Sequence, residues 1–296
     1  MINKFVHAGI VNPEELSTIE QCAQSAGIDI VYLDGSFVLP SSDQDIHKNY
    51  QSKRLPGALF FDITSIADKS SSLPHMIPDA EGFSQAVSRL GIKNTDLIIV
   101  YGQHGLVMGP ARVWWMFKGF GHPNVIVLNG GLPAYEQAGL PLETSTPKTP
   151  EPSIYKASLF NDSMVIQMDQ MLDTVRNKSG HILDARPANR FSGESPEPRE
   201  NMRSGHMPGA LNAPSSTLVD ENGKLKSAED LQKLFADAGV TPEHDQNIIT
   251  TCGSGITACA LSLALYHLGH HNTAVYDGSW SEWGLGDSNT PIEKST

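Results

Sequence analysis

The chain repeats itself at a separation of 150 residues, and this duplication limits its fold more than any other feature. Asp34 in "VYLDGS" corresponds to Asp184 in "HILDARP", and Gly102 in "YGQHG" corresponds to Cys252 in "TCGSG". Both pairs give the same separation (184 − 34 and 252 − 102), and Pro-Gly-Ala-Leu also occurs once in each half. A period this long indicates two duplicated domains, not a solenoid of short repeats.

The 296 residues are enough for two domains of ordinary size. Between the halves, residues 143–157 are rich in Pro, Ser and Thr and show no apolar periodicity, which is typical of a linker. We therefore expect an N-terminal domain at residues 1–142 and a C-terminal domain at residues 158–296.

Each half alternates short apolar, β-branched runs with helical patterns. These runs predict strands at residues 29–34, 57–62, 96–101, 124–129, 181–186, 209–214, 247–252 and 273–278. Among the helices, one begins after Ser227, a plausible N-cap, and stops at Gly239. The alternation predicts an α/β fold with a doubly wound, mostly parallel sheet flanked by helices in each domain. Such sheets bind ligands at the carboxyl ends of their strands, which is where Cys252 lies.

Cys252 stands between a predicted strand and an apolar helical pattern that runs from Ala258 to Leu268. Backbone N–H groups at the start of a helix stabilise a thiolate. Gly253 and Gly255 would let the loop curl so that these groups converge on the sulfur. A cysteine after a strand is often only a small buried hydrophobe, but flanking glycines weaken packing and favour a reactive thiolate.

Charge and composition exclude several kinds of partner. The net charge is −12 with a pI near 5.3, and no basic cluster is present, so we expect no nucleic-acid partner. No apolar run reaches the length of a membrane span, and the first residues do not resemble a signal peptide. Three cysteines, an odd number, argue against a disulfide framework. We expect a cytoplasmic protein with no membrane partner.

The loop "CGSGITA" resembles the active-site loop of the rhodanese superfamily of sulfurtransferases, most closely that of 3-mercaptopyruvate sulfurtransferases. Other stretches are similar to family motifs in the same order: "LDGSFVLP", "PGALFFDI", "ARVWWMFKGFGH", "PEPRENMRSGHMPGALN" and "YDGSWSEWG". The resemblance covers nearly the whole chain. It implies two tandem rhodanese-like domains, of which the N-terminal one is non-catalytic because Gly102 replaces the cysteine.

The resemblance also implies a reaction. The thiolate of Cys252 would attack the sulfur of 3-mercaptopyruvate, release pyruvate and become a persulfide, which is covalent catalysis by double displacement. A second nucleophile (a small thiol, thioredoxin or cyanide) would then accept the outer sulfur. No metal or other cofactor is expected.

Substrate binding needs planar donors for a carboxylate and a keto oxygen, which arginine supplies well. Arg190 and Arg199 match the arginines with which mercaptopyruvate enzymes hold their substrate, whereas Arg186 is expected to support the domain itself. The resemblance assigns the rest of the substrate site to the loop residues Gly253, Gly255, Ile256 and Thr257.

Two further catalytic residues follow from the resemblance. Ser254 is a candidate donor or relay for the proton that the leaving enolate needs, and His75 in "LPHMIP" matches a histidine that joins it. Family members generally carry a carboxylate where this chain has Thr64, which argues against a strict Cys–His–Asp triad. His104, in the N-terminal counterpart of the loop, has no assigned role.

Other functions remain as alternatives. Thiosulfate sulfurtransferases typically carry basic residues directly after the cysteine, where this chain has Gly253 and Ser254, and they generally lack the arginine at position 199. A persulfide carrier for a partner protein would not need a carboxylate clamp. A phosphatase would need an arginine in the loop, and none follows Cys252.

Three histidines and two cysteines are assigned structural positions. His267, His270 and His271 are interpreted as a solvated helix end, because no carboxylate or cysteine joins them to form a metal site. Cys259, on the helix after Cys252, is expected to pack in the core, and Cys22 is interpreted as a helix residue.

Overall fold

The computed structural model describes residues 2–39, 42–241 and 246–295. The chain forms two compact units, each assembled from three segments. Unit 1 contains Met1–Asp68, Ile77–Asn161 and Val219–Leu225, and unit 2 contains Lys69–Met76, Asp162–Leu218 and Lys226–Thr296. Each half of the duplication therefore contributes one short segment to the other unit, and the two segments start 150 residues apart.

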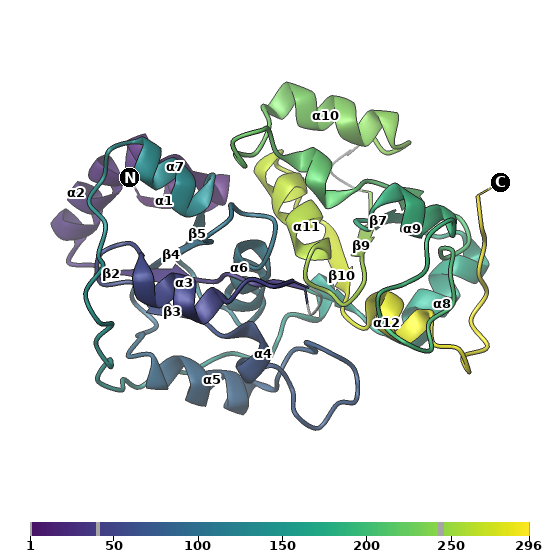
Figure 1. Cartoon of the computed structure of the whole chain (residues 1–296), viewed down its shortest axis with the longest axis horizontal. Helices are drawn as coiled ribbons and strands as arrows, with labels where there is room; N and C mark the ends of the chain where they lie inside the picture. Colours follow the sequence, from purple (N-terminus) through teal and green to yellow (C-terminus); the bar gives the residue numbers. More distant parts are fainter. Residues whose placement is uncertain (1, 40–41, 242–245, 296) are drawn as a thin grey trace. The chain divides into compact units, whose positions relative to one another are not determined.

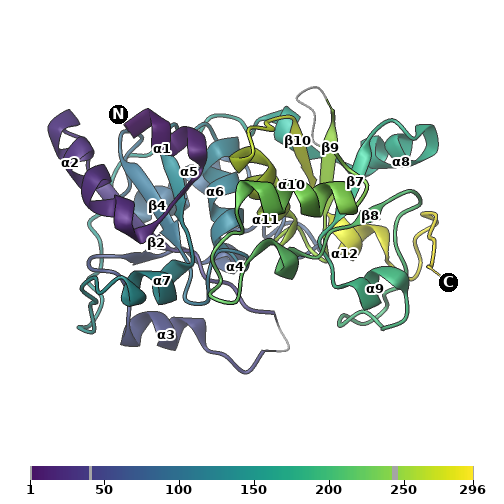
Figure 2. The same ribbon diagram turned by 90° about the horizontal axis from the view of Figure 1, so that it is seen from above.

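Unit 1 is built on a five-stranded sheet in which every strand pair is parallel. Its strands lie in the order β1 (Ile10–Val11), β5 (Val125–Leu128), β4 (Leu97–Tyr101), β2 (Ile30–Asp34) and β3 (Leu59–Phe60). Its helices are α1 (Ile2–Ala8), η1 (Pro13–Glu15), α2 (Leu16–Ala26), α3 (Ile46–Ser52), α4 (Ile63–Ile66), α5 (Ala80–Arg89), α6 (Pro110–Gly119) and α7 (Gly131–Gln137). Helices flank the strands in both views (Figures 1 and 2).

Unit 2 repeats this topology strand for strand. Its sheet, also parallel throughout, has the order β6 (Val165–Ile166), β10 (Thr273–Tyr276), β9 (Ile248–Thr251), β7 (His181–Asp184) and β8 (Leu211–Asn212). Its helices are η2 (Asp162–Met164), α8 (Met168–Asn177), α9 (Ala188–Ser192), η3 (Ser215–Leu218), α10 (Ala228–Asp237), α11 (Ala258–His267) and α12 (Ser279–Trp283). The predicted α/β fold with two duplicated parallel sheets is thus confirmed.

The central strands are buried along their whole length because helices cover both faces of each sheet. Every residue of β4 and of β9 is buried, which explains why these strands are continuous apolar or β-branched runs and not alternating ones. Helix α11 is buried from Ala258 to Leu265, as expected for a helix that is apolar all round. It packs against β9 and β10, and this fixes the position of the loop that precedes it.

Local capping agrees with the sequence at several helix ends. The Ser227 side chain accepts a hydrogen bond from the Asp230 backbone, and Gly239 adopts a left-handed conformation after α10, as predicted. The segment 143–157, interpreted as a linker, has no helix or strand and belongs to unit 1, where Tyr155 is buried. Within the described residues, no helix is both long and apolar enough to cross a lipid bilayer.

Candidate active site

Cys252 follows the last residue of β9, at the carboxyl end of the central strand of unit 2. Its side chain is buried, with the residue only 2% exposed, and six residues separate β9 from the start of α11. Gly255 adopts φ +75°, a left-handed conformation that favours glycine and turns the loop back toward the helix. Within the described residues, the amides of four loop positions have no protein acceptor: Gly253, Ser254, Ile256 and Thr257. The loop can therefore solvate negative charge through its backbone.

Ser279, at the start of α12, holds this loop through hydrogen bonds. Its hydroxyl accepts hydrogen bonds from the amides of Cys252 (3.3 Å) and Gly255 (3.1 Å) and donates to the Tyr276 carbonyl oxygen (2.7 Å). The Trp280 amide donates to the Cys252 carbonyl oxygen at 2.9 Å. Ser279 is fully buried and has φ +51°, an unfavourable conformation for a residue with a Cβ. The sequence analysis did not identify this residue.

The two arginines predicted to bind substrate lie against the loop at Gly253. A Cβ placed on Gly253 would be 3.3 Å from Arg190 Nη2 and 3.7 Å from Arg199 Nη1, so both guanidinium groups approach the same loop residue. Burial lowers the pKa of Arg199, the Cys252 thiolate opposes this shift, and neighbouring Arg190 adds to it. Arg199 nevertheless stays charged at neutral pH, because an arginine side chain does not deprotonate in proteins.

A chain of buried ion pairs fixes Arg190 in this position. Arg186 binds Asp184 through Nη2 at 2.6 Å and Glu197 through Nη1 at 2.8 Å, and its guanidinium stacks over Trp280 at 4.0 Å. Glu197 then accepts from Arg190 through both Nε and Nη2. Arg186 is therefore committed to the structure of the domain, while Arg190 extends from the network toward the loop. The sequence analysis missed Glu197, whose side chain is only 3% exposed.

Ser254 connects Arg199 to His75. Arg199 Nη2 donates to Ser254 Oγ at 3.1 Å, and His75 Nδ1 lies 3.2 Å from the same oxygen. Because arginine can only donate, the Ser254 proton is left to point at His75 when Nδ1 of that ring is unprotonated. His75 has φ +63° and lies in the segment Lys69–Met76, which belongs to unit 2. Thr64 lies on α4 of unit 1.

The rhodanese-like domain model matches residues 41–138 and 166–285, which together make up most of the chain. This chain belongs to the rhodanese family. The 3-mercaptopyruvate sulfurtransferase of Escherichia coli K12 is 40% identical over 266 residues, covering 90% of this chain and 92% of that protein. The thiosulfate sulfurtransferase of Rattus norvegicus is 38% identical over 285 residues, covering 96% of this chain and 94% of that protein.

Among solved structures, SseA from Escherichia coli, a 3-mercaptopyruvate sulfurtransferase, matches with a TM-score of 0.79 and 36% identity over 93% of this chain and 99% of that one. The relatives named for the two sulfur donors are thus almost equally identical to this rhodanese. Overall identity establishes the family, but it does not separate one donor from the other.

The rhodanese loop of unit 1 cannot accommodate a nucleophile. A Cβ on Gly102 would lie 2.9 Å from Pro110 Cγ and would also overlap the Gly105 carbonyl oxygen. Next to it, the Gln103 side chain donates to Asp34 at 2.6 Å and to the Lys53 carbonyl oxygen at 3.1 Å. The loop of unit 1 has therefore closed over the position that Cys252 occupies in unit 2.

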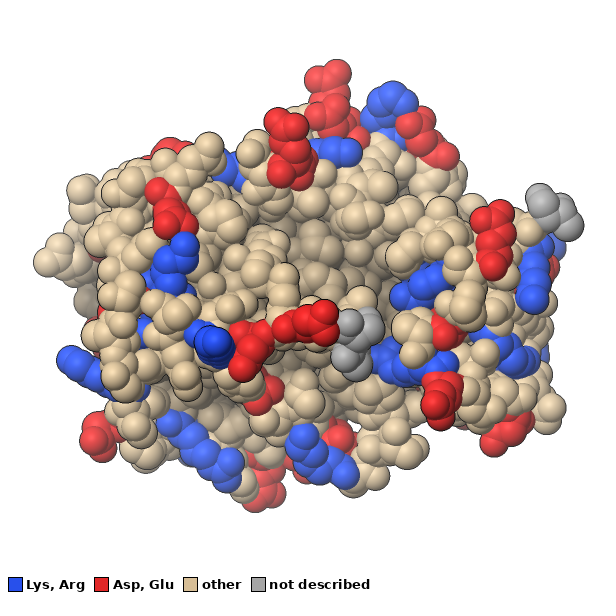
Figure 3. All heavy atoms as spheres, in the orientation of Figure 1, with Lys and Arg blue, Asp and Glu red and all other residues tan. Residues whose placement is uncertain are grey.

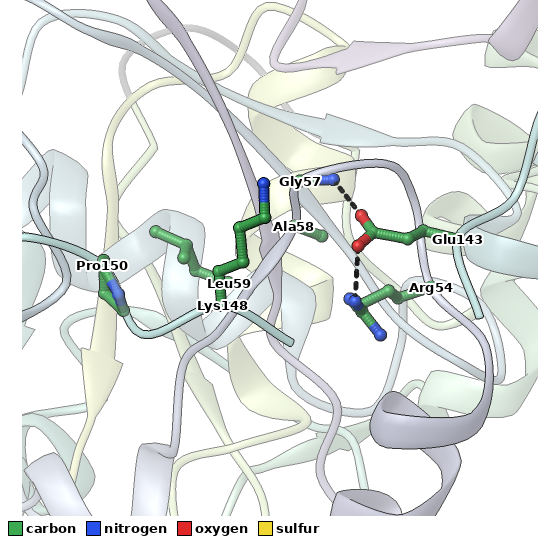
Figure 4. Close-up of a pocket in the computed structure, with 7 residues that line it drawn as sticks. All are labelled: Arg54, Gly57, Ala58, Leu59, Glu143, Lys148 and Pro150. Atoms are coloured by element: carbon green, nitrogen blue, oxygen red, sulfur yellow. Dashed lines mark hydrogen bonds and ion pairs between the residues drawn. The ribbon is translucent and has the colours of Figure 1, made fainter. Parts of the chain in front are cut away.

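A separate pocket of about 300 Å³ lies in unit 1 (Figure 4). Its lining residues are Arg54, Gly57, Ala58, Leu59, Glu143, Lys148 and Pro150. Arg54 Nη2 pairs with Glu143 at 2.7 Å, and the Gly57 amide donates to the same carboxylate at 2.7 Å (Figure 4). These groups satisfy one another, and the pocket contains none of the residues predicted for the rhodanese site.

One expectation about the histidines is wrong. His270 is buried and its Nε2 lies 3.2 Å from the Asn272 carbonyl oxygen, so this position is not a solvated helix end. The reason is that α11 stops at His267 and Gly269 (φ +87°) turns the chain back onto the helix. No cluster of metal-binding side chains occurs within residues 2–39, 42–241 and 246–295.

All three cysteines of the chain lie within the described residues. Cys22, Cys252 and Cys259 are free thiols in the structure. Cys259 is buried on α11, with Sγ 3.2 Å from the Gly255 carbonyl oxygen. Acidic and basic side chains are interspersed over the face drawn in Figure 3.

Proposed function

We propose that this rhodanese is a 3-mercaptopyruvate sulfurtransferase that carries sulfur as a persulfide on Cys252. The observation that supports this most strongly is the convergence of Arg190 and Arg199 on Gly253, the residue after the nucleophile. Two planar donors at one place suit a substrate with a carboxylate and an adjacent keto oxygen. The catalytic half is residues 158–296, completed by His75 from the segment that joins unit 2.

In the first step the Cys252 thiolate attacks the donor sulfur. A sulfur–sulfur bond forms, the sulfur–carbon bond breaks, and its electron pair moves onto the pyruvate carbon as an enolate. Arg190 and Arg199 stabilise the enolate charge in this proposal, since both guanidinium groups approach Gly253 next to the nucleophile. The thiol proton of the donor ends on that carbon, so the products are pyruvate and an ionised persulfide.

Three hydrogen-bonded side chains, Arg199, Ser254 and His75, support a route for the proton. Arg199 donates to Ser254, and Ser254 Oγ lies 3.2 Å from His75 Nδ1. With Nδ1 protonated, the imidazole can donate to Ser254 while the Ser254 hydroxyl gives its proton to the enolate, and the thiol proton of the donor then reprotonates the imidazole. This relay needs no carboxylate at position 64. The amides of the loop solvate the thiolate and the persulfide alike.

In the second step an acceptor takes the outer sulfur. A small thiol, thioredoxin or cyanide attacks it and returns Cys252 to the thiolate, which completes the double displacement. The thiolate must stay unoxidised between turnovers, so a reducing compartment such as the cytoplasm suits this chemistry.

Thiosulfate is the second candidate donor, because relatives named for it are almost as similar as those named for mercaptopyruvate. Steady-state pyruvate release from 3-mercaptopyruvate with a thiol acceptor is the test, run beside thiocyanate formation from thiosulfate and cyanide. We expect the higher kcat/KM with mercaptopyruvate and no activity for Cys252→Ser with either donor. A higher kcat/KM with thiosulfate would contradict the proposal. Sulfur uptake by Cys252 from a protein, without turnover of either small donor, would indicate a carrier.

A further inference from the structure

Four charged side chains next to the proposed donor site are arranged as two neutral pairs. Asp184 and Arg186 form one pair, with contacts through Nε and Nη2 of the arginine. Glu197 and Arg190 form the other, since both Nε and Nη2 of Arg190 donate to one carboxylate oxygen of Glu197. The second oxygen of Glu197 accepts from Arg186. The network therefore contributes no net charge, although it places a guanidinium directly at the loop.

Arg199 is a cation that this network does not bind through an ion pair, although burial lowers its pKa and the charge of Glu197 opposes this shift at longer range. Within the described residues no carboxylate forms an ion pair with it, and its side chain donates to the neutral hydroxyl of Ser254. The thiolate of Cys252 is the natural counter-charge of Arg199. The charge of a bound sulfur donor is then not balanced by the site. This charge is −1 for mercaptopyruvate and −2 for thiosulfate.

We propose that Glu197 is a specificity-determining residue: by neutralising Arg190 it makes the site favour monoanionic sulfur donors over dianionic ones. This inference rests on the proposed sulfurtransferase function. Glu197 also orients Arg190: Nε and Nη2 of the guanidinium donate to Glu197, and Nη2 also lies against Gly253, so its second N–H is left for a bound anion. The arginine thus offers directed hydrogen bonds to a carboxylate without adding a full positive charge.

The substitution Glu197→Gln removes the charge and nearly keeps the shape. Arg190 would then act as a second free cation on any anion bound at Cys252. Coulomb's law, at a separation of about 6 Å and an effective dielectric constant of about 40, gives a change on the order of tenfold for each unit of negative charge. We expect the ratio of kcat/KM for thiosulfate to kcat/KM for mercaptopyruvate to rise by about tenfold.

A matched control is available three residues away. Glu194 is exposed, and Glu194→Gln removes the same charge from the same segment without touching the buried network. We expect this variant to keep the wild-type ratio. An equal ratio in Glu197→Gln and Glu194→Gln would overturn the inference.

A second measurement does not depend on which donor the enzyme uses. The rate of Cys252 alkylation by the anion iodoacetate is divided by the rate with neutral iodoacetamide, so that thiolate reactivity cancels and the local charge remains. We expect Glu197→Gln to raise this ratio by about tenfold. Failure of the wild-type enzyme to use mercaptopyruvate would contradict the proposed function, whereas an unchanged alkylation ratio would contradict the role of Glu197.

Removing one member of a buried ion pair can prevent folding, so the double variant Arg190→Gln with Glu197→Gln provides a further test. If Glu197 neutralises Arg190, the double variant loses no net charge at the loop. Its alkylation ratio should then stay within about twofold of the wild-type value. A ratio several-fold below wild type would show that the charge of Arg190 had acted alone, and it would refute the inference.

Discussion

The hydroxyl of Ser279 should contribute to both the stability and the activity of this enzyme, because it binds the loop that carries Cys252. It is the acceptor for two buried amides, those of Cys252 and Gly255, and for the hydroxyl of Thr251 at 3.4 Å. The substitution Ser279→Ala removes the hydroxyl and keeps the strained φ of +51°, since alanine also has a Cβ. Both loop amides would then lose this acceptor.

The size of the effect follows from these two bonds. A buried donor left without a partner costs roughly 1–3 kcal/mol, and the two N–H···O distances of 3.1 and 3.3 Å indicate bonds of moderate strength. We therefore expect Ser279→Ala to lower the free energy of unfolding of unit 2 by about 2–4 kcal/mol. The loop would also relax around Cys252, and a displacement of this kind lowers kcat/KM by roughly tenfold to a hundredfold.

Urea denaturation and the pyruvate assay measure the two effects. Ser281→Ala is the matched control, because the Ser281 hydroxyl is also buried but donates only to the Gly278 carbonyl oxygen at 2.7 Å. Its backbone amide, which donates to the Gly253 carbonyl oxygen, is unaffected by the substitution. Equal losses of stability and activity in the two variants would refute the idea that Ser279 holds the loop.

Two further predictions concern unit 1. Gly102→Cys should not create a second active site: it should lower the stability of unit 1 by about 1–3 kcal/mol, because the Cβ overlaps the backbone, and give no sulfur transfer when combined with Cys252→Ser. Urea denaturation and the thiocyanate assay check this. Burial lowers the pKa of His122 to about 4, so between about pH 6.5 and pH 4 only the unfolded chain takes up this proton. Stability should fall by up to about 3 kcal/mol as the pH is lowered through this window, and His122→Gln should remove that loss in urea titrations.

The central strands could be predicted because residues 97–101 and 248–252 are continuous apolar or β-branched runs, and they contain the buried strands β4 and β9. The two-residue strands β3 and β8 could be predicted because Pro-Gly-Ala-Leu recurs in both halves. The edge strands β1 and β6 have two residues each, too few for any periodicity, and the sequence analysis missed both. The duplication predicted that the two sheets would match, and they do.

Among the site residues, Cys252 stands out by its own type, because a thiol between glycines at the start of a helix has few roles. Arg190 and Arg199 could be predicted only because they match arginines of the mercaptopyruvate sulfurtransferases. Glu197 resembles any charged residue of a polar segment until burial shows that it joins two arginines. Ser279 lies 27 residues after Cys252, and no local sequence pattern encodes the hydrogen bond between them.

The two units show how a duplicated fold can keep or lose a nucleophile. Each has a buried aspartate at the end of its second strand, Asp34 or Asp184, which must be satisfied. In unit 2, Arg186 binds Asp184, and the loop position after the nucleophile can remain Gly253.

In unit 1 the residue that corresponds to Arg186 is Ser36, whose hydroxyl donates to Asp34 and accepts from the backbone amide of Gln103 at 2.8 Å. Burial raises the pKa of Asp34, while hydrogen bonds from Ser36 and Gln103 oppose the shift. Gln103 occupies the loop position that glycine holds in unit 2, and its side chain donates to the aspartate at 2.6 Å. The buried aspartate of unit 2 is bound by Arg186, which lies outside the loop, whereas that of unit 1 is bound by the loop residue Gln103. This difference separates a loop that can bind a substrate from one that has closed.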